Sequence, residues 1–410
     1  MDFRVGLLLA AQLLLALFLL YRAGLLKSGR AWLVSFLLLI GAFALRAAAL
    51  DYETLDYQNF LSRWVSFFRE NGGFRALSQP VGNYNIPYLY FLALFSYSGI
   101  RDLYLIKLLS LLFDVLLAWA CARLAGRFTR SRTRALACFF AVLYLPTVFL
   151  NSAVWGQCDG VYAALAVLGI ALALEDRPVR SMICIALSFG FKLQAVFVMP
   201  VYAVLWMYRK FNWKHFLIFP LTYLLLVLLA VLLGRPFLDT LTLYASQTGS
   251  IGSGLNYNSP SIFAVFTQVQ NPERASGIAI AAALLYTLNI LAVAWANRRR
   301  LTDQAILGAA LLFAIGIPFL LPHMHDRYFY AADILSLVLA FSAPAFSLTA
   351  LLVQFASLLG YHAYLKTRYL LPMRYGAAAL ILAFALSLAY FLMGLPPQPT
   401  PGKTRQRKIL

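Results

Sequence analysis

The sequence predicts an all-α protein, a polytopic bundle of transmembrane helices, and three observations support this prediction. Hydrophobic residues form 62% of the 410-residue chain, charged residues form 12%, and the mean hydropathy is +0.77. Soluble domains contain about 25% charged residues, so the chain lies outside that class. Long apolar runs recur up to residue 393, with short basic clusters between them. We therefore predict a single integral membrane domain over residues 1–410.

The net charge of +19 has a topological explanation. In a soluble protein such a charge suggests nucleic-acid binding. Here the basic residues gather between apolar runs, which is the pattern that sets the orientation of a membrane protein. The sequence therefore predicts the lipid bilayer as a partner and excludes nucleic acid.

The apolar runs predict about twelve or thirteen spans, since a helix needs about 20 apolar residues to cross a bilayer. The run 84–99 is too short to cross. We expect it to form a second interfacial or re-entrant helix beside residues 56–70, within an external loop over 51–100. A lysine inside 181–208 predicts two short limbs there. The predicted spans are 5–22, 31–50, 103–124, 135–150, 159–175, 181–208, 216–233, 276–296, 303–321, 327–343, 346–365 and 375–393.

Lysine and arginine predict the orientation, because they accumulate on the cytoplasmic side. This rule places the loops 51–83, 151–158, 234–275 and 322–327 outside, and the basic tail 395–410 inside. One loop resists the assignment, because Lys366, Arg368 and Arg374 fall outside. Either a span is miscounted or this loop binds an anionic group. The cytoplasmic clusters are Arg22/Lys27/Arg30, Arg123/Arg127/Arg130/Arg132/Arg134, Arg209/Lys210/Lys214, Arg298/Arg299/Arg300 and Lys403/Arg405/Arg407/Lys408.

Three carboxylates follow the second span directly: Asp51, Glu53 and Asp56. Acidic residues are costly near a membrane, so such a cluster is a candidate for a general base. The alternative is a solvated loop that caps the preceding helix. The next residues place aromatic side chains at helical spacing on one face, which predicts an interfacial amphipathic helix. These aromatic residues are Tyr57, Phe60, Trp64, Phe67 and Phe68.

Polar residues also interrupt the middle of the chain at two places. Trp155 is typical of the aromatic belt of a membrane protein, whereas we expect Gln157 and Asp159 beside it to line the site. Lys192 and Gln194 break an apolar run. Either Lys192 snorkels to the membrane surface or a broken helix presents both residues to a phosphate. We favour the second interpretation, because snorkelling does not explain the glutamine.

The predicted external loop 234–260 is long, polar and rich in glycine. Long loops of this kind are binding loops, lids or disordered segments. Glycine hinges between Tyr244 and Tyr257 favour a loop that closes on a substrate.

The segment 323–327 (HMHDR) holds two of the four histidines. His323 and His325 could share a metal only in a strand or loop, where an i, i+2 pair lies on one face. An arginine that binds a lipid-linked phosphate, framed by imidazoles, fits a membrane site better. The alternative is a polar loop with belt tyrosines.

In their order along the chain, these motifs resemble the glycosyltransferase-C superfamily of membrane enzymes. Residues 55–60 (LDYQNF) and 83–88 (NYNIPY) resemble the first external loop of the endoplasmic-reticulum glucosyltransferases and of the glycosylphosphatidylinositol mannosyltransferase. The segment 323–327 is similar to the HxHEK-type motif of the glucosyltransferases, with Asp326 and Arg327 in place of Glu and Lys. Residues 155–159 and 192–194 resemble elements of bacterial members.

This resemblance implies transfer of a hexose from a polyprenyl-phosphate donor to a glycan or glycolipid acceptor outside the cell membrane, by direct inverting displacement. Asp56 is then the base and Asp51 orients the acceptor, although their roles could be exchanged. No metal or other cofactor is expected. His323 and His325 are the only argument in favour of a metal. The residues expected to bind the donor phosphate are Arg327, His325, His323 and Lys192. Those expected to line the substrate are Glu53, Tyr57, Trp155, Gln157, Asp159, Gln194 and Asp326.

Two other functions fit parts of the pattern. A transporter or flippase of lipid-linked sugars also carries ionisable residues within the membrane, but its site lies near the midplane. Most polar groups here fall at one interface, with Lys192 as the exception. A scaffold subunit with a decayed site is the third interpretation, which turnover would exclude.

Overall fold

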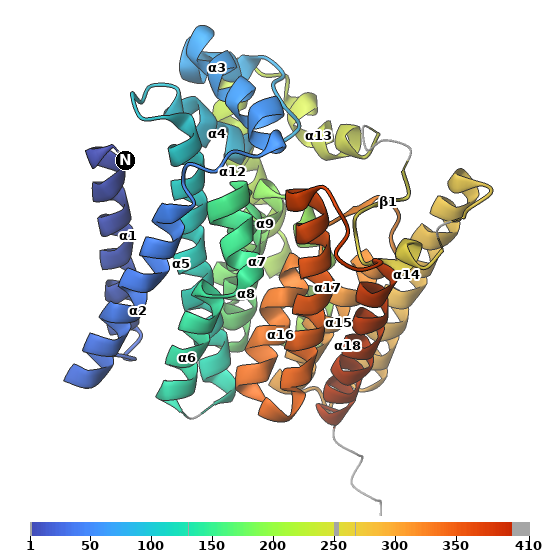
Figure 1. Ribbon diagram of the computed structural model, residues 1–410. Helices are drawn as coiled ribbons and strands as arrows, with labels where there is room; N and C mark the ends of the chain where they lie inside the picture. The colour runs from blue at the N-terminus through green and yellow to red at the C-terminus, as the bar shows by residue number, and fades with distance from the viewer. Residues whose placement is uncertain (1, 130, 250–253, 267, 396–410) are drawn as a thin grey trace, which may run out of the picture.

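The computed structural model describes residues 2–129, 131–249, 254–266 and 268–395, and this part of the chain is an all-α bundle (Figure 1). The predicted basic tail falls almost wholly outside these residues. Within them, eight helices are long and apolar enough to cross a membrane. They comprise α1 (Phe3–Arg22), α2 (Gly29–Ala48), α5 (Asp102–Phe128), α11–α12 (Trp213–Phe216 and Ile218–Leu232), α14 (Pro272–Ala296), α15 (Asp303–Leu320), η6–α17 (Pro344–Phe346 and Ser347–Lys366) and α18 (Arg374–Met393).

The remaining predicted spans are helical but shorter or bent. A pair bent by 44° at the break adds a ninth candidate span, formed by α6 (Arg132–Leu143) with α7 and η3 (Pro146–Phe149 and Leu150–Trp155). The segment 181–208 forms two limbs as predicted, because the chain is extended at Lys192. The shorter helices are α8 (Asp159–Leu174), α9 (Pro178–Phe191), η4 (Leu193–Phe197), α10 (Val201–Met207) and α16 (Tyr330–Ser342).

Short helices cover one end of the bundle (Figure 1). The predicted helices near 56–70 and 84–99 are both present, and α4 is largely buried against its neighbours. The end of α5 and the start of α6, which carry Arg127, Arg132 and Arg134, lie at the opposite end. The covering elements are η1 (Tyr57–Leu61), α3 (Ser62–Glu70), η2 (Gly73–Ser78), α4 (Ile86–Phe95) and α13 (Phe237–Gly249).

Two details of this covering layer differ from the prediction. Phe60 is 49% exposed, whereas Leu61, Val65 and Phe68 are buried. The cause is the π-helical turn η1, whose extra residue rotates the buried face by one position. The loop 234–260 contains the helix α13, and Thr240 and Leu243 form its buried stripe. Residues 250–253 of that loop lie outside the described residues.

A short parallel ribbon joins two segments that are distant in sequence. Strand β1 (Asn256–Tyr257) pairs with β2 (Met324–His325), so that Tyr257 lies opposite His325. The turn η5 (Ile262–Ala264) follows β1. The backbone of His323 is left-handed, with φ of 62°, a conformation that costs free energy for a non-glycine residue. The ribbon thus ties the chain before α14 to the turn between α15 and α16.

A buried ion pair joins α2 to α5 inside the bundle. The Nε and Nη2 atoms of Arg46 donate to Oδ2 of Asp114 at 3.1 and 2.9 Å, and the Ser152 hydroxyl donates to the same oxygen at 2.6 Å. Both charged residues are at most 1% exposed. Removing one partner of such a pair is costly, because the other charge stays buried without compensation.

We expect Arg46→Met to lower the free energy of unfolding by about 3–5 kcal/mol, because Asp114 then lacks its counter-ion. The measurement is the unfolding midpoint of purified protein in detergent. The double variant Arg46→Met/Asp114→Leu serves as the control, and we expect it to recover part of the loss. A single variant as stable as the wild type would contradict this role of the pair.

Candidate functional site

A cavity of about 600 Å³ lies beneath the covering helices, at the end of the bundle. Its walls come from η1 and α3, the segment 83–85, the end of η3, the break after α9, α13, the β1–β2 ribbon and α17. Its lining residues are Asp56, Phe60, Leu61, Trp64, Asn83, Tyr84, Asn85, Trp155, Gln157, Phe191, Lys192, Leu193, Gln194, Tyr244, Tyr257, Asn258, His325, Asp326, Arg327, Tyr328 and Tyr364.

Asp56 is fixed on one wall of this cavity by hydrogen bonds. Its Oδ2 atom accepts from Nε1 of Trp155 at 2.8 Å and from Nε2 of Gln157 at 2.9 Å. The Gln157 amide oxygen accepts in turn from the hydroxyl of Tyr84 at 2.9 Å. The ring of Tyr364 stacks on Trp155, with 3.8 Å between the centroids, and its hydroxyl oxygen accepts from the backbone N–H of Asp56. The carboxylate therefore has a set position and a set orientation.

The backbone around Asp56 is held by two buried residues. The Nζ atom of Lys107 donates to the carbonyl oxygens of residues 49, 50 and 52, at 2.8, 3.1 and 2.6 Å. The Thr54 hydroxyl donates to the carbonyl of Trp155 at 3.2 Å. One π-helical turn begins just after Asp56 and another ends at Trp155, before Gly156 with its φ of 77°. Such turns are frequent at functional sites.

The cavity also carries two cations that share one buried counter-ion. Oδ1 of Asp159 accepts from Nζ of Lys192 at 2.5 Å, and its Oδ2 lies 3.2 Å from Nε of Arg327. Asn151 donates to the same Oδ2 at 2.8 Å. The guanidinium of Arg327 also lies over the Trp155 ring, 5.1 Å from its centroid. Asp159 is buried and does not line the cavity, whereas both cations do.

The two histidines predicted at this site have different surroundings. His325 lines the cavity and stacks on Tyr257, with 4.7 Å between the ring centroids. Burial, together with the charge of Arg327, lowers the pKa of His325 to about 4, so its imidazole is neutral at pH 7. His323 points elsewhere, since its Nδ1 lies 2.8 Å from the carbonyl oxygen of Gly254. Within the described residues, no three His, Cys, Asp or Glu side chains form a group suited to a metal.

Asp326 is the titratable group next to the cations. Burial raises its pKa to about 7, and the positive charge of Arg327 opposes this shift. One of its oxygens, Oδ1, lies 3.8 Å from Nη1 of Arg327. The charge beside Arg327 therefore changes close to neutral pH.

The structure brings most of the predicted site residues together but leaves several outside. Asp51 and Glu53 lie near Arg101 on the surface, and the Asp51 side chain is 80% exposed. The Tyr57 hydroxyl donates to Asp102. With His323 and the buried Asp159, these residues do not line the cavity. Those that do are Asp56, Trp155, Gln157, Lys192, Gln194, His325, Asp326 and Arg327.

Sequence reasoning missed several aromatic and amide residues of the site. Tyr84 and Asn85 belong to the segment 83–88 that carried the resemblance, so a signal for them was present. Tyr364 and Tyr328 sit in apolar helical runs or next to them, where a tyrosine is typical of the membrane interface. Asn151 is the first residue of the predicted external loop 151–158, where a polar residue is ordinary, so the sequence carried no signal for its contact with Asp159.

The sequence matches the model of glycosyltransferase family 87 over residues 83–322, which is more than half of the chain. The chain belongs to this family. Family 87 comprises membrane glycosyltransferases of the GT-C type, so the resemblance inferred from the motifs is confirmed. The matched range contains Gln157, Lys192 and Gln194 but ends before Arg327 and begins after Asp56. A comparison with curated proteins found no match.

The family 87 assignment gives the cavity a chemical context. Transfer of a sugar requires a group that activates an acceptor and groups that stabilise a leaving group. The cavity offers a carboxylate on one wall and two cations on another, with the aromatic side chains of Trp64, Tyr84 and Trp155 among the lining residues.

We expect Asp159→Asn to lower the free energy of unfolding by about 3–5 kcal/mol, because it leaves Lys192 and Arg327 buried without their counter-ion. Thermal unfolding of the purified family 87 protein measures the loss. The matched control is Asp51→Asn at the exposed carboxylate, which should change stability by no more than about 0.5 kcal/mol. Equal stability of the two variants would show that Asp159 is not the anchor of these cations.

Proposed function

We propose that this family 87 enzyme transfers a hexose from a polyprenyl-phosphate-linked donor to a glycan or glycolipid acceptor on the extracytoplasmic face. The observation that carries the proposal is that Asp56, Lys192 and Arg327 line one cavity, where the Trp155 ring contacts both Asp56 and Arg327. The reaction is a direct displacement with inversion at the anomeric carbon.

In this proposal Arg327 and Lys192 bind the phosphate of the donor. Asp159 occupies only part of their hydrogen-bonding capacity, and an arginine presents five N–H donors in a planar fork that suits a phosphate. Negative charge grows on the leaving phosphate oxygen during transfer. Preorganised cations at that position are an effective way of lowering the barrier. His325, being neutral, contributes a hydrogen bond rather than a charge.

Asp56 is the proposed general base. The hydrogen bonds from Trp155 and Gln157 converge on Oδ2, and we assign Oδ1 to the acceptor hydroxyl. Asp56 takes the hydroxyl proton while the acceptor oxygen bonds to the anomeric carbon. The bond from that carbon to the phosphate oxygen breaks, and the polyprenyl phosphate leaves with the electron pair.

A buried acceptor atom supports sugar binding in the same cavity. The Oε1 atom of Gln194 is buried, and no described residue donates a hydrogen bond to it. An unpaired buried acceptor is costly and calls for an explanation. A hydroxyl of the transferred sugar is the partner we assign to it.

The orientation follows from the basic clusters of the sequence. The arginine-rich ends of α5 and α6, with Arg127, Arg132 and Arg134, lie at the end of the bundle opposite the cavity. Because such clusters face the cytoplasm, the cavity faces outward. The transporter alternative has less support, since the family predicts sugar transfer and the polar groups gather at one end.

We expect Asp56→Asn to reduce the rate of transfer by about 10²–10⁴-fold, the range that general-base catalysis contributes, with donor affinity unchanged. The assay uses protein in nanodiscs, radiolabelled polyprenyl-phosphate sugars as donors and a membrane extract as the source of acceptor. Asp51→Asn is the matched control and should keep most of its activity. Loss with Asp51→Asn alone would assign the base to Asp51, and transport of label without transfer would refute the enzyme.

We expect the KM for the donor to rise with pH by up to about tenfold per unit above pH 7. Below that pH Asp326 is protonated and neutral, whereas above it the carboxylate competes with the donor phosphate for Arg327. The KM of the Asp326→Asn variant should be flat over pH 6–8, and that of Glu70→Gln, at an exposed site, should follow the wild type. The same slope in Asp326→Asn would contradict this assignment.

A further inference from the structure

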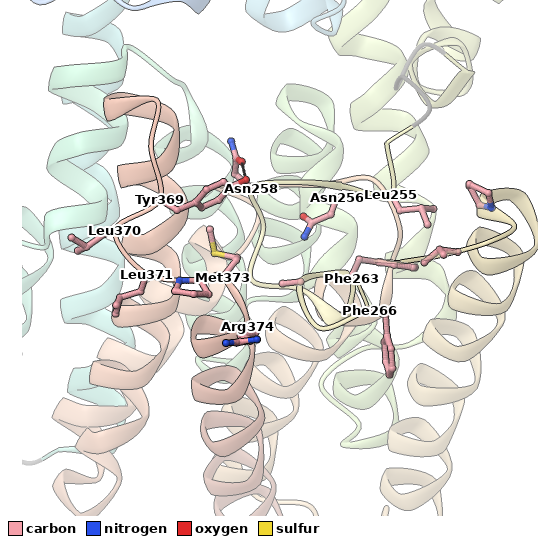
Figure 2. Close-up of a pocket in the computed structure, with 14 residues that line it drawn as sticks. Leu255, Asn256, Asn258, Phe263, Phe266, Tyr369, Leu370, Leu371, Met373 and Arg374 are labelled. Carbon is pink, nitrogen blue, oxygen red and sulfur yellow. Dashed lines mark hydrogen bonds between the residues drawn. The ribbon is translucent and has the colours of Figure 1, made fainter.

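A second cavity, of about 750 Å³, lies on the other side of the β1–β2 ribbon. Figure 2 shows its two walls, one from residues 255–266 and the other from residues 369–374. Asn258 lines both cavities, and its Oδ1 accepts from the hydroxyl of Tyr369. Asn258 is therefore a shared wall between this cavity and the candidate active site.

The lining of this second cavity is mostly apolar and continues onto the surface. Phe266 is 61% exposed and Leu370 is 65% exposed. Leu370 lies between the candidate spans α17 and α18, and Phe266 lies a few residues before the candidate span α14. At that level an exposed apolar surface faces lipid. The apolar lining residues are Leu255, Phe263, Ala264, Phe266, Val269, Pro272, Leu370, Leu371, Pro372 and Met373.

The charged residues of the turn beside this cavity are all basic. Arg374 lines the cavity, and Lys366 and Arg368 belong to the same turn between α17 and α18. No ion pair involves these three cations within the described residues. The sequence has no acidic residue over 240–272 or over 334–395, so neither wall offers a counter-ion. These cations also break the pattern of basic residues at the opposite end of the bundle, which an anionic ligand explains.

We propose that this cavity binds one anionic phospholipid from the leaflet on the side of the candidate active site. The phosphate lies at Arg374, and an acyl chain fills the space between Phe263 and Leu371. A lipid without net charge would not use the arginine that lacks an ion-pair partner among the described residues, and a free phosphate would not use the apolar walls. The volume lies within the range of about 300–1,000 Å³ that is typical of ligand pockets.

The position of the lipid suggests what it does for the protein. The ribbon between the two cavities carries His325 and Tyr257 on the catalytic side, and its Asn256 lines the lipid side. A bound acyl chain packs behind the ribbon and stabilises it. The proposal does not depend on the sugar donor or the acceptor, so it can be tested without an activity assay.

Native mass spectrometry of the full-length protein in detergent tests the proposal, with phosphatidylglycerol and phosphatidylcholine as the probes. We expect one phosphatidylglycerol per chain, bound at least about tenfold more tightly than phosphatidylcholine, because the choline ammonium of the latter offsets its phosphate charge and is repelled by the basic residues at this site. Arg374→Gln should remove this preference, whereas Arg374→Lys should keep part of it. Val269→Trp, which fills the cavity, should weaken binding of both lipids.

The matched control is Arg69→Gln, which removes an exposed arginine of α3 outside the cavity and should change lipid affinity by less than about twofold. Equal affinity for the two lipids in the wild type would overturn the proposal. The proposal would also be overturned if Arg69→Gln lowered the affinity for phosphatidylglycerol as much as Arg374→Gln does, or if Val269→Trp left lipid binding unchanged. A further competition uses undecaprenyl phosphate. If it displaces phosphatidylglycerol, binds more tightly and depends on Arg374, the cavity is assigned to a polyprenyl lipid instead.

Discussion

The carboxylate of Asp159 is the interaction on which the candidate site depends most. Asp159 is the first residue of α8. Its carboxylate contacts Lys192, which lies at the break after α9, and Arg327, which lies in the turn before α16. Two cations from separate parts of the chain are held in a buried position because one anion compensates both. A buried cation without such a partner would be very costly in a membrane protein. The counter-ion therefore makes a preformed pair of buried cations possible.

The layer that covers this end of the bundle serves the other half of the site. Lys107 and Thr54 fix the chain before η1, and Trp155 and Gln157 then hold Asp56 over the cavity. Asp56 and Arg327 thus belong to different elements that meet at the Trp155 ring, which donates a hydrogen bond to Asp56 from its edge and contacts Arg327 with its face. Both cations pair with Asp159, and within the described residues no ion pair joins either of them to Asp56.

The sequence was sufficient for the fold class, the helical segments and the charged residues of the cavity, because charge inside apolar runs is rare and informative. It placed Lys192 at a helix break correctly for that reason. It also put Asp51, Glu53 and His323 at the site, since sequence proximity to Asp56 and His325 does not reveal which way a side chain points. The π-turn that exposes Phe60 and the helix within 234–260 left no clear periodic signal. Tyr364 and Asn258 reach the cavity only through tertiary packing.

The central claim is that the donor phosphate lies between Arg327 and Lys192 with the anomeric carbon facing Asp56. Electron cryomicroscopy of the Asp56→Asn variant in nanodiscs with a polyprenyl-phosphate sugar tests it most directly, since the variant should bind the donor without turning it over. We predict phosphate density within hydrogen-bonding distance of both cations and the sugar toward residue 56. A phosphate bound near Arg101, or a sugar directed away from residue 56, would contradict the account.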